Sequence, residues 1–311
     1  MRNNSFKSSR AQEYDFAVAL PAVLWQILFL YVPLCFIIYI SFIKAIDFFI
    51  FKNITLANYK ALFNPIYFSI IIRSIFLAFF NALFCLFLGY PVAYFLALRA
   101  KRFKNMLLFL LILPFWTNFL VQAYAWFFIL DYHGFLNKVL LKIGIISTPL
   151  HILNTPWAIY IVMLFCYLPF MVLPIYSSMT KINKYILEAS SDLGATNWQT
   201  LGYVTLPLSL SGIRTGFFLV LIPSFGEFVI PALLGGGKIM YVGSMISYFF
   251  LETKNVFLGS AFTVLSGACL IAIALLIYLV FRKLSKPSGF TGATGPSIKT
   301  NNSAKLSQGN K

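Results

Sequence analysis

A polar segment between two long apolar runs reads EASSDLG at residues 188–194 and, nine residues later, VTLP at residues 204–207. The first part holds several good helix formers and has polar side chains on one side. Gly194 closes it, and glycine readily adopts the positive φ that ends a helix. The first part therefore predicts a short helix with a polar side, followed by a sharp turn.

The nine residues between the two parts carry a start signal for a second short helix. Thr196 and Gln199 have the spacing of a capping box, in which each side chain caps the backbone N–H of the other residue. Leu206 and Pro207 are expected to end this helix, because proline disfavours helical geometry at the residue before it. On physical grounds alone, the segment fits any pair of short helices between membrane spans.

The composition around this segment is that of a membrane protein. Of the 311 residues, 60% are hydrophobic and only 10% are charged. A soluble domain cannot hide that much apolar surface, whereas a helical span needs about 20 apolar residues. The apolar runs are continuous rather than alternating, which favours helices over an outer-membrane barrel. The expected spans are Phe16–Ile43, Phe68–Leu98, Met106–Leu130, Trp157–Met179, Leu208–Leu234 and Leu258–Phe281. The prediction is an all-α membrane protein with about six transmembrane helices.

The formal net charge of +16 is explained by where the basic residues lie. Lysines and arginines cluster before the first apolar run and after the second, fourth and sixth runs. Loops rich in these residues stay on the cytoplasmic side of a membrane. Both termini and the loop at about 180–207 are therefore expected in the cytoplasm. The expected location is the cell inner (cytoplasmic) membrane, as a multi-pass protein in contact with membrane lipid and without a nucleic-acid partner.

The chain divides into three parts by composition. We expect a polar cytoplasmic segment at residues 1–13, a transmembrane domain at 14–284 and a disordered basic cytoplasmic tail at 285–311. The two histidines, His133 and His151, are eighteen residues apart in one outer loop, and solvated loop side chains are favoured over the alternative of a metal site there, so no metal site is expected. The sequence has neither a phosphate-binding loop nor a nucleophile–base pair. We therefore expect no catalytic residue and no enzymatic activity in this chain.

The segment at 188–207 closely resembles the coupling motif of ABC-importer permeases. That motif runs Glu-Ala-Ala, three residues, Gly, nine residues, Ile, any residue, Leu-Pro, and five of its seven positions are identical here. Ser190 and Val204 are conservative replacements of the other two. In that family the helix pair docks on a separate ATPase. The resemblance implies ATPase coupling through Glu188, Ala189, Ser190, Gly194, Leu206 and Pro207.

Further segments resemble the permeases of spermidine and putrescine importers. They are TLANY at 55–59, LPFWT at 113–117, YAW at 124–126, YLPFMVLP at 167–174 and PSFGEFVIPALLGG at 223–236. The resemblance covers roughly residues 16–281 and implies a type I ABC-importer permease bundle. It implies a translocation path for polyamines, with a second, related permease, an ABC ATPase dimer and a periplasmic or surface substrate-binding protein as partners. The ATPase would use ATP and Mg, and this chain itself would bind no cofactor.

A polyamine is a flexible polycation, which carboxylates and aromatic faces suit chemically. Glu227 is the only carboxylate well inside an apolar run, and an ionisable group there is costly and by default a functional candidate. The alternative is that Glu227 pairs with a neighbouring helix or points to the outer headgroups. Trp116, Tyr124, Trp126 and Tyr167 offer cation–π faces, although aromatic belts at membrane interfaces also place such residues. The predicted substrate path is lined by these five residues.

Other functions are compatible with parts of this pattern. The runner-up is an ABC permease for another small solute, such as ferric iron, thiamine or a phosphonate. A secondary transporter driven by an ion gradient is less favoured, because it should show internal repeats and several membrane-embedded acids. An intramembrane enzyme is disfavoured because it should show paired catalytic groups. Measuring which solutes bind the partner binding protein separates the first two possibilities.

Overall fold

The computed structural model describes residues 20–43, 54–100, 102–237 and 239–284. Within these ranges the protein is helical, and an isolated antiparallel bridge joins Ile43 to Ile54. The predicted cytoplasmic segment at 1–13 and the predicted tail at 285–311 lie outside the described residues. The described ranges all fall within the predicted transmembrane domain at 14–284, which includes the loop at about 180–207.

The described part of the chain contains five helices that are long and apolar enough to cross a membrane. They are Leu20–Ser41, Pro65–Arg99, Pro156–Met179, Asn197–Phe225 and Val256–Lys283. The bent pair Lys104–Trp116 and Phe119–Ile143 adds a sixth span if it crosses as one. The prediction of an all-α membrane protein with about six spans is confirmed.

The helices are divided by turns of other helical types. In chain order the elements are η1 (Ile27–Tyr31), α2 (Val32–Ser41), α3 (Ala57–Leu62), α4 (Pro65–Tyr94), η3 (Phe95–Arg99), α5 (Lys104–Ile112), η4 (Leu113–Trp116), α6 (Phe119–Leu130), α7 (Phe135–Ile143), α8 (Pro156–Met179), α9 (Lys184–Asp192), α10 (Asn197–Thr200), η5 (Leu201–Thr205), α11 (Leu206–Phe225), α12 (Val229–Leu234), α13 (Val242–Ser247), η6 (Tyr248–Glu252) and α14 (Val256–Leu284). The turn η4 is a 3₁₀ helix, and the other η elements are π-helical. Such turns change the direction or register of a helix and often mark functional positions.

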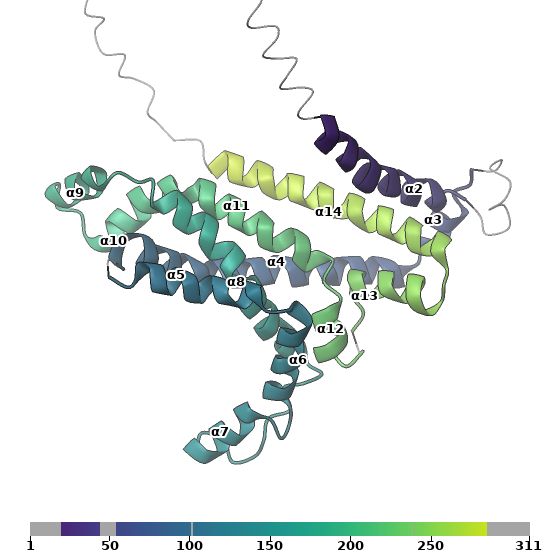
Figure 1. Ribbon diagram of the computed structural model, residues 1–311, viewed down its shortest axis with the longest axis horizontal. Coiled ribbons are helices and arrows are strands. Elements are labelled where there is room, and N and C mark those ends of the chain that lie inside the picture. Colours follow the sequence, from purple (N-terminus) through teal and green to yellow (C-terminus); the bar gives the residue numbers. More distant parts are fainter. Residues whose placement is uncertain (1–19, 44–53, 101, 238, 285–311) are drawn as a thin grey trace, which may run out of the picture.

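The core of the bundle is formed by α4, α8 and α11. Small residues let α8 and α11 approach closely: a Cβ at Gly212 would lie 2.6 Å from both the carbonyl oxygen of Pro174 and the Cβ of Ser178. A Cβ at Gly216 would lie 3.0 Å from the carbonyl oxygen of Met171. Close backbone approach through small residues is a common way for helices to associate in lipid. On the flank of this core, α2 packs along α14 (Figure 1).

Buried polar side chains tie the core helices together. Asn81 of α4 donates a hydrogen bond to Ser224 of α11 at 2.8 Å, and both side chains are fully buried. Ser74 of α4 accepts from the backbone N–H of Val242, the first residue of α13, at 2.7 Å. Lipid offers no hydrogen-bond partner, so polar groups inside a span must be paired within the protein. These two bonds fix α11 and α13 relative to α4.

The third expected span, Met106–Leu130, is not a single straight helix. The chain bends by 97° between Lys104–Trp116 and Phe119–Ile143. Thr117 takes an extended conformation, and the Asn118 side chain accepts from the backbone N–H of Leu120 at 2.8 Å, which starts a new helix there. The physical reason is that an N-cap residue follows the proline-containing turn η4, so the run restarts in a new direction.

The fifth apolar run is also interrupted. Helix α11 ends at Phe225, and α12 begins only at Val229. The intervening Gly226 has no side chain to favour helix continuation. Glu227 therefore stands in a break between two helices rather than on a helix face.

Leu206 and Pro207 were expected to end the second short helix, and they do not. Asn197–Phe225 forms one helix that runs through the π-turn η5 and into α11. Proline is tolerated in the first turn of a helix, and Pro207 occupies that position of α11. The π-turn widens the backbone just before it, with the N–H of Leu206 bonded to the carbonyl of Leu201. The second helix of the pair, α10, is thus continuous with a membrane span.

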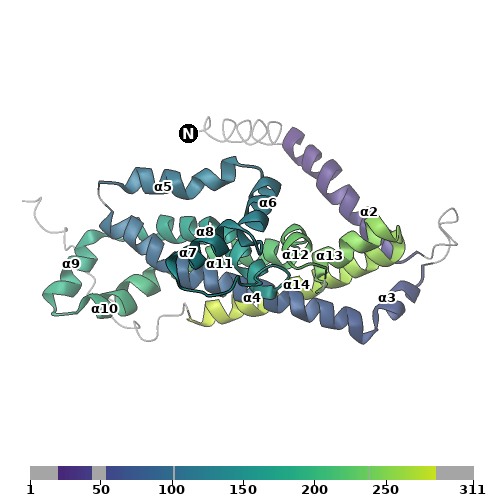
Figure 2. The ribbon, with the colours of Figure 1, turned by 90° about the horizontal axis from the view of Figure 1, so that it is seen from below.

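The long axis of the molecule has two distinct ends. Both views place α9 and α10 at one end and α3 at the other (Figures 1 and 2). Between the ends, α6 and α7 project from the side of the bundle (Figure 1), because the break after η4 turns them away from α5. Two breaks, in the third and the fifth runs, therefore shape the middle of the bundle.

Candidate functional site

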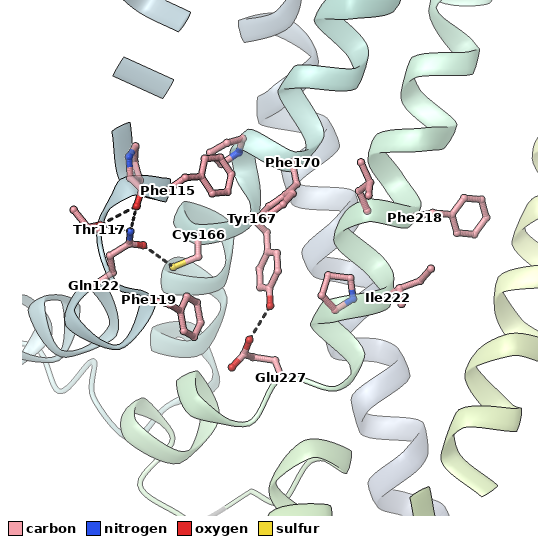
Figure 3. Close-up of a pocket in the computed structure, with 14 residues that line it drawn as sticks. Phe115, Thr117, Phe119, Gln122, Cys166, Tyr167, Phe170, Phe218, Ile222 and Glu227 are labelled. Atoms are coloured by element: carbon pink, nitrogen blue, oxygen red, sulfur yellow. Dashed lines mark hydrogen bonds between the residues drawn. The ribbon is translucent and has the colours of Figure 1, made fainter. Parts of the chain in front are cut away.

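A cavity of about 620 Å³ lies where the two interrupted runs meet α8. Its walls come from η4 and α6, from the middle of α8, and from the last turns of α11 with the break after it (Figure 3). Four phenylalanines line it: Phe115, Phe119, Phe170 and Phe218. The rings of Phe115 and Phe170 pack edge to face with their centroids 4.7 Å apart. The cavity is therefore largely apolar and aromatic, like most small-molecule sites.

Glu227 lines this cavity from the break after α11, with only 9% of its surface exposed. One carboxylate oxygen accepts hydrogen bonds from the backbone N–H groups of Val229 and Ile230, at 2.9 and 3.4 Å. The other oxygen accepts from the Tyr167 hydroxyl at 2.7 Å (Figure 3). The carboxylate thus caps the start of α12 and reaches the cavity beside an aromatic ring. Its partner Tyr167 belongs to α8, so the pairing with a neighbouring helix considered for Glu227 is present.

The other aromatic residues of the predicted substrate path do not line this cavity. Trp116 is 75% exposed and contacts the ring of Phe109 edge on, and Tyr124 is 50% exposed. Trp126 packs its ring against Phe165, with centroids 5.2 Å apart. Exposed aromatic side chains on a membrane bundle are typical of contact with lipid or with another subunit. Of the predicted residues, the structure brings together Glu227 and Tyr167.

Gln122 of α6 is a cavity residue that sequence reasoning missed. Its side-chain nitrogen donates to the carbonyl oxygen of Pro114 and to the hydroxyl oxygen of Thr117, across the break in the third run. Its side-chain oxygen accepts a weak hydrogen bond from the Cys166 thiol of α8, at 3.8 Å (Figure 3). The available signal was an amide within an otherwise apolar run, just after a proline and an N-cap asparagine. Such a polar group needs partners in lipid, which marks it for attention.

The side-chain donors of the cavity are all used within the protein. The Tyr167 hydroxyl donates to Glu227, and the Thr117 hydroxyl donates to Pro114 at 2.8 Å. The Gln122 amide and the Cys166 thiol donate as described above. None of the described residues that line the cavity is basic. The cavity therefore presents to a ligand a set of acceptors and aromatic faces, which fits a ligand that is rich in donors and positively charged.

The segment that resembles the coupling motif forms a compact helix pair at one end of the bundle (Figure 1). Gly194 has a φ of +82°, as the turn requires, and a Cβ there would meet nothing within 4 Å. Thr196 and Gln199 form the predicted capping box at the start of α10. The hydroxyl groups of Ser190 and Thr200 are hydrogen-bonded at 2.7 Å, which joins α9 to α10. The predicted pair of short helices with a glycine turn is confirmed.

The helix pair exposes large apolar side chains. Leu193 and Trp198 are 89% and 82% exposed, and Tyr203 is as exposed as Trp198. Glu188 and Ala189 of the neighbouring helix α9 are exposed as well. Large apolar side chains grouped on a surface with polar neighbours mark protein–protein contact sites. The end of the bundle that carries α9 and α10 therefore has the character of a docking surface.

A multi-pass helical bundle with a cavity at interrupted spans has the architecture of a membrane transport protein. Residues 86–288 match the family described as "Binding-protein-dependent transport system inner membrane component", and the chain belongs to that family. It is a permease subunit of an ABC importer, and it is a transport component rather than an enzyme. The predicted resemblance to ABC-importer permeases is thereby confirmed.

Curated relatives narrow the similarity further. The chain is 40% identical over 267 residues to the "Spermidine/putrescine transport system permease protein PotB" of Salmonella typhimurium (strain SL1344), covering 86% of this chain and 93% of that protein. It is also 40% identical over 255 residues to the PotB protein of Escherichia coli (strain K12), covering 82% and 92%. The "Inner membrane ABC transporter permease protein YdcU" of Escherichia coli (strain K12) is 31% identical over 243 residues, covering 74% and 76%.

A solved structure shares the fold. A chain of the "bacterial ABC transporter involved in the import of the acidic polysaccharide alginate" aligns with a TM-score of 0.71 and 18% identity, over 91% of this chain and 100% of that chain. At this identity the likeness shows the architecture alone. The predicted ABC-importer permease bundle is therefore confirmed as a fold.

Proposed function

We propose that this chain forms part of the path by which an ATP-driven importer carries polyamines, spermidine or putrescine, across the inner membrane. The observation that carries the proposal is the cavity, whose side-chain donors are all used internally and whose free groups are acceptors and aromatic faces. A polyamine presents only N–H donors, positive charge and methylene segments. The names of the PotB relatives support the same cargo.

The other solutes considered suit this cavity less well. A phosphonate is an anion and would need donors or basic side chains, which the described lining does not offer. Ferric iron would need a cluster of ligands, and no group of three or more His, Cys, Asp or Glu residues that could hold a metal is present among the described residues. Thiamine is a cation, so the chemistry of the cavity distinguishes it from a polyamine less clearly than it distinguishes the other two solutes. Competition by thiamine during polyamine uptake distinguishes the two.

The proposed partners are supported by the exposed helix pair and by the distribution of basic residues along the chain. We place α9 and α10 in the cytoplasm, with both termini, because the basic residues cluster on that side. There Glu188, Ala189, Ser190 and Gly194 would contact an ABC ATPase dimer, which binds ATP and Mg. Leu206 and Pro207 would join this contact to α11. A second, related permease would complete the path, and a periplasmic or surface binding protein would deliver the cargo, as in the alginate transporter whose structure includes "alginate pentasaccharide-bound periplasmic protein".

Reconstitution tests this proposal directly. The chain is placed in vesicles together with a second permease, an ABC ATPase and a polyamine-binding protein, and labelled putrescine and spermidine are supplied. We expect saturable uptake that requires ATP, and no uptake when this chain is reconstituted alone, because it has no ATP-binding sequence of its own. The proposal would be overturned by ATP-dependent uptake by the isolated chain, or by a complete complex that takes up neither polyamine.

A substitution in the helix pair should uncouple transport from ATP hydrolysis. Gly194→Asp places a side chain at a φ of +82°, at a cost on the order of 1 kcal/mol, and redirects α10. Glu188→Lys reverses a charge on the exposed face of α9 and should break complementary pairing with the ATPase. We expect both variants to insert normally and to lose most cargo-stimulated ATP hydrolysis and uptake.

Gly144 supplies the matched control for this experiment. It also has a positive φ, +77°, and a Cβ at this position would meet nothing within 4 Å, but it ends α7 on the projecting α6–α7 unit. Gly144→Asp should carry similar strain and leave ATP hydrolysis coupled. Normal coupling in both variants of the helix pair, at wild-type expression, would contradict the assignment of this surface to the ATPase.

A further inference from the structure

The amide group of Gln122 has one orientation that its surroundings allow. The carbonyl oxygen of Pro114 can only accept a hydrogen bond, so the atom of Gln122 that contacts it must be the nitrogen. The Thr117 hydroxyl already donates its hydrogen to the same carbonyl oxygen, at 2.8 Å, and must therefore accept from Gln122. Both N–H groups of the amide are thus used, and its surroundings fix the orientation of the amide through these bonds.

This orientation leaves the amide oxygen of Gln122 facing the cavity. The contact it makes among the described residues is with the Cys166 thiol, at 3.8 Å, and a thiol is a weak donor. A cationic N–H donor from a ligand would form a stronger bond and displace that contact at little cost. The side chain is half-buried and lines the cavity, so a ligand in the cavity can reach it.

Gln122 and Glu227 approach the cavity from different elements. Figure 3 shows Gln122 on the α6 wall and Glu227 beneath Tyr167, with Cys166 lying between Gln122 and Tyr167. The two acceptors differ in kind, since one is a carboxylate and the other a neutral amide oxygen. A cargo with two or more separated amines can therefore meet an acceptor at each of two places, with its methylene segment against the phenylalanines that line the cavity.

We propose that Gln122 is a second cargo-recognising residue, whose amide oxygen accepts from an amine of the cargo distant from the amine that Glu227 binds. The inference rests on the proposed polyamine path and adds a specificity element to it. In this arrangement Glu227 supplies most of the attraction, and Gln122 supplies discrimination in favour of cargo with a second donor.

Two substitutions with side chains of similar length distinguish two roles of Gln122: binding of the cargo by its oxygen, and bracing of the break in the third run by its N–H groups. Gln122→Met removes the donors and the acceptor, whereas Gln122→Glu removes the donors and keeps an acceptor oxygen. The reconstituted complex is supplied with saturating putrescine-loaded binding protein, so that the maximal uptake rate reports the permease rather than cargo capture. We expect Gln122→Met to lower this rate about tenfold and Gln122→Glu to keep at least about half of it, which corresponds to the loss of one charge-assisted bond in the first variant alone.

The controls make each result decisive. Gln26→Met changes an exposed glutamine on the first span, away from the cavity, and should transport normally. An equal loss of uptake in the Met and Glu variants would mean that Gln122 only braces the break, and an unchanged Met variant would mean that it does not meet the cargo; either result overturns the inference. If wild-type vesicles take up no putrescine, the proposed function itself fails. If wild-type vesicles take up putrescine and Glu227→Gln lowers that uptake, the proposed function is supported whatever the Gln122 variants show.

Discussion

Replacing Glu227 by glutamine is expected to lower ATP-dependent polyamine uptake by at least about tenfold while leaving the complex assembled. Glutamine keeps the shape of the side chain and an oxygen that can accept from the N–H groups of Val229 and Ile230, so the start of α12 stays capped. The substitution removes the negative charge beside the aromatic cavity. A hydrogen bond between charged groups contributes more than a neutral one, and the effect grows where water is excluded.

The measurement compares initial uptake rate with the yield of purified complex for wild type and variant. Glu252→Gln is the matched control, because Glu252 is an exposed carboxylate at the end of η6 that does not line this cavity. We expect normal uptake from the control and normal complex yield from both variants. If uptake by Glu227→Gln stays at the wild-type rate, Glu227 serves only to cap α12 and to pair with Tyr167.

Replacing Gly212 by alanine is expected to destabilise the whole bundle. The added Cβ would lie 2.6 Å from the carbonyl oxygen of Pro174 and from the Cβ of Ser178, closer than non-bonded atoms approach. Backbone rather than a flexible side chain provides one of these contacts, so α8 and α11 must move apart. Overpacking of this kind costs about 1–3 kcal/mol, which should appear as a lower thermal midpoint in detergent and a lower yield.

Gly267 of α14 supplies the control for Gly212→Ala. A Cβ there would meet nothing within 4 Å, and alanine is the better helix former. Gly267→Ala should therefore leave the thermal midpoint unchanged or raise it slightly. Equal midpoints for Gly212→Ala and Gly267→Ala would show that the close approach of α8 and α11 does not limit stability.

The parts of the fold that depend on local chemistry are predictable from the sequence. Apolar runs of sufficient length located the spans, since burial in lipid depends on composition alone. The capping box of Thr196 and Gln199 and the positive φ of Gly194 were also predictable, because both are set by residues within one turn. Hydropathy says nothing of direction, however, so the 97° bend within the third run was not expected.

The site was less predictable, because its bonds join residues far apart in the chain. Glu227 and its partner Tyr167 are 60 positions apart, and the buried bond between Asn81 and Ser224 spans 143 positions. No local pattern encodes such pairings. Aromatic residues were poor guides for a related reason: a tryptophan such as Trp116 suits lipid contact as well as a cavity wall, and only packing decides between them.

The continuous helix Asn197–Phe225 links the helix pair directly to the cavity wall, so that a rigid tilt of this helix would move both ends together. Its 29 residues make it about 43 Å long at about 1.5 Å per residue. The tight contact of Gly212 with α8 lies between the two ends of this helix and would be the point about which the helix tilts. A tilt of about 10° around it would move Asn197 by about 4 Å and Ile222, on the cavity wall, by about 2.5 Å in the opposite sense. A displacement of the helix pair would thus change the width of the cavity through this one helix, without depending on flexible loops.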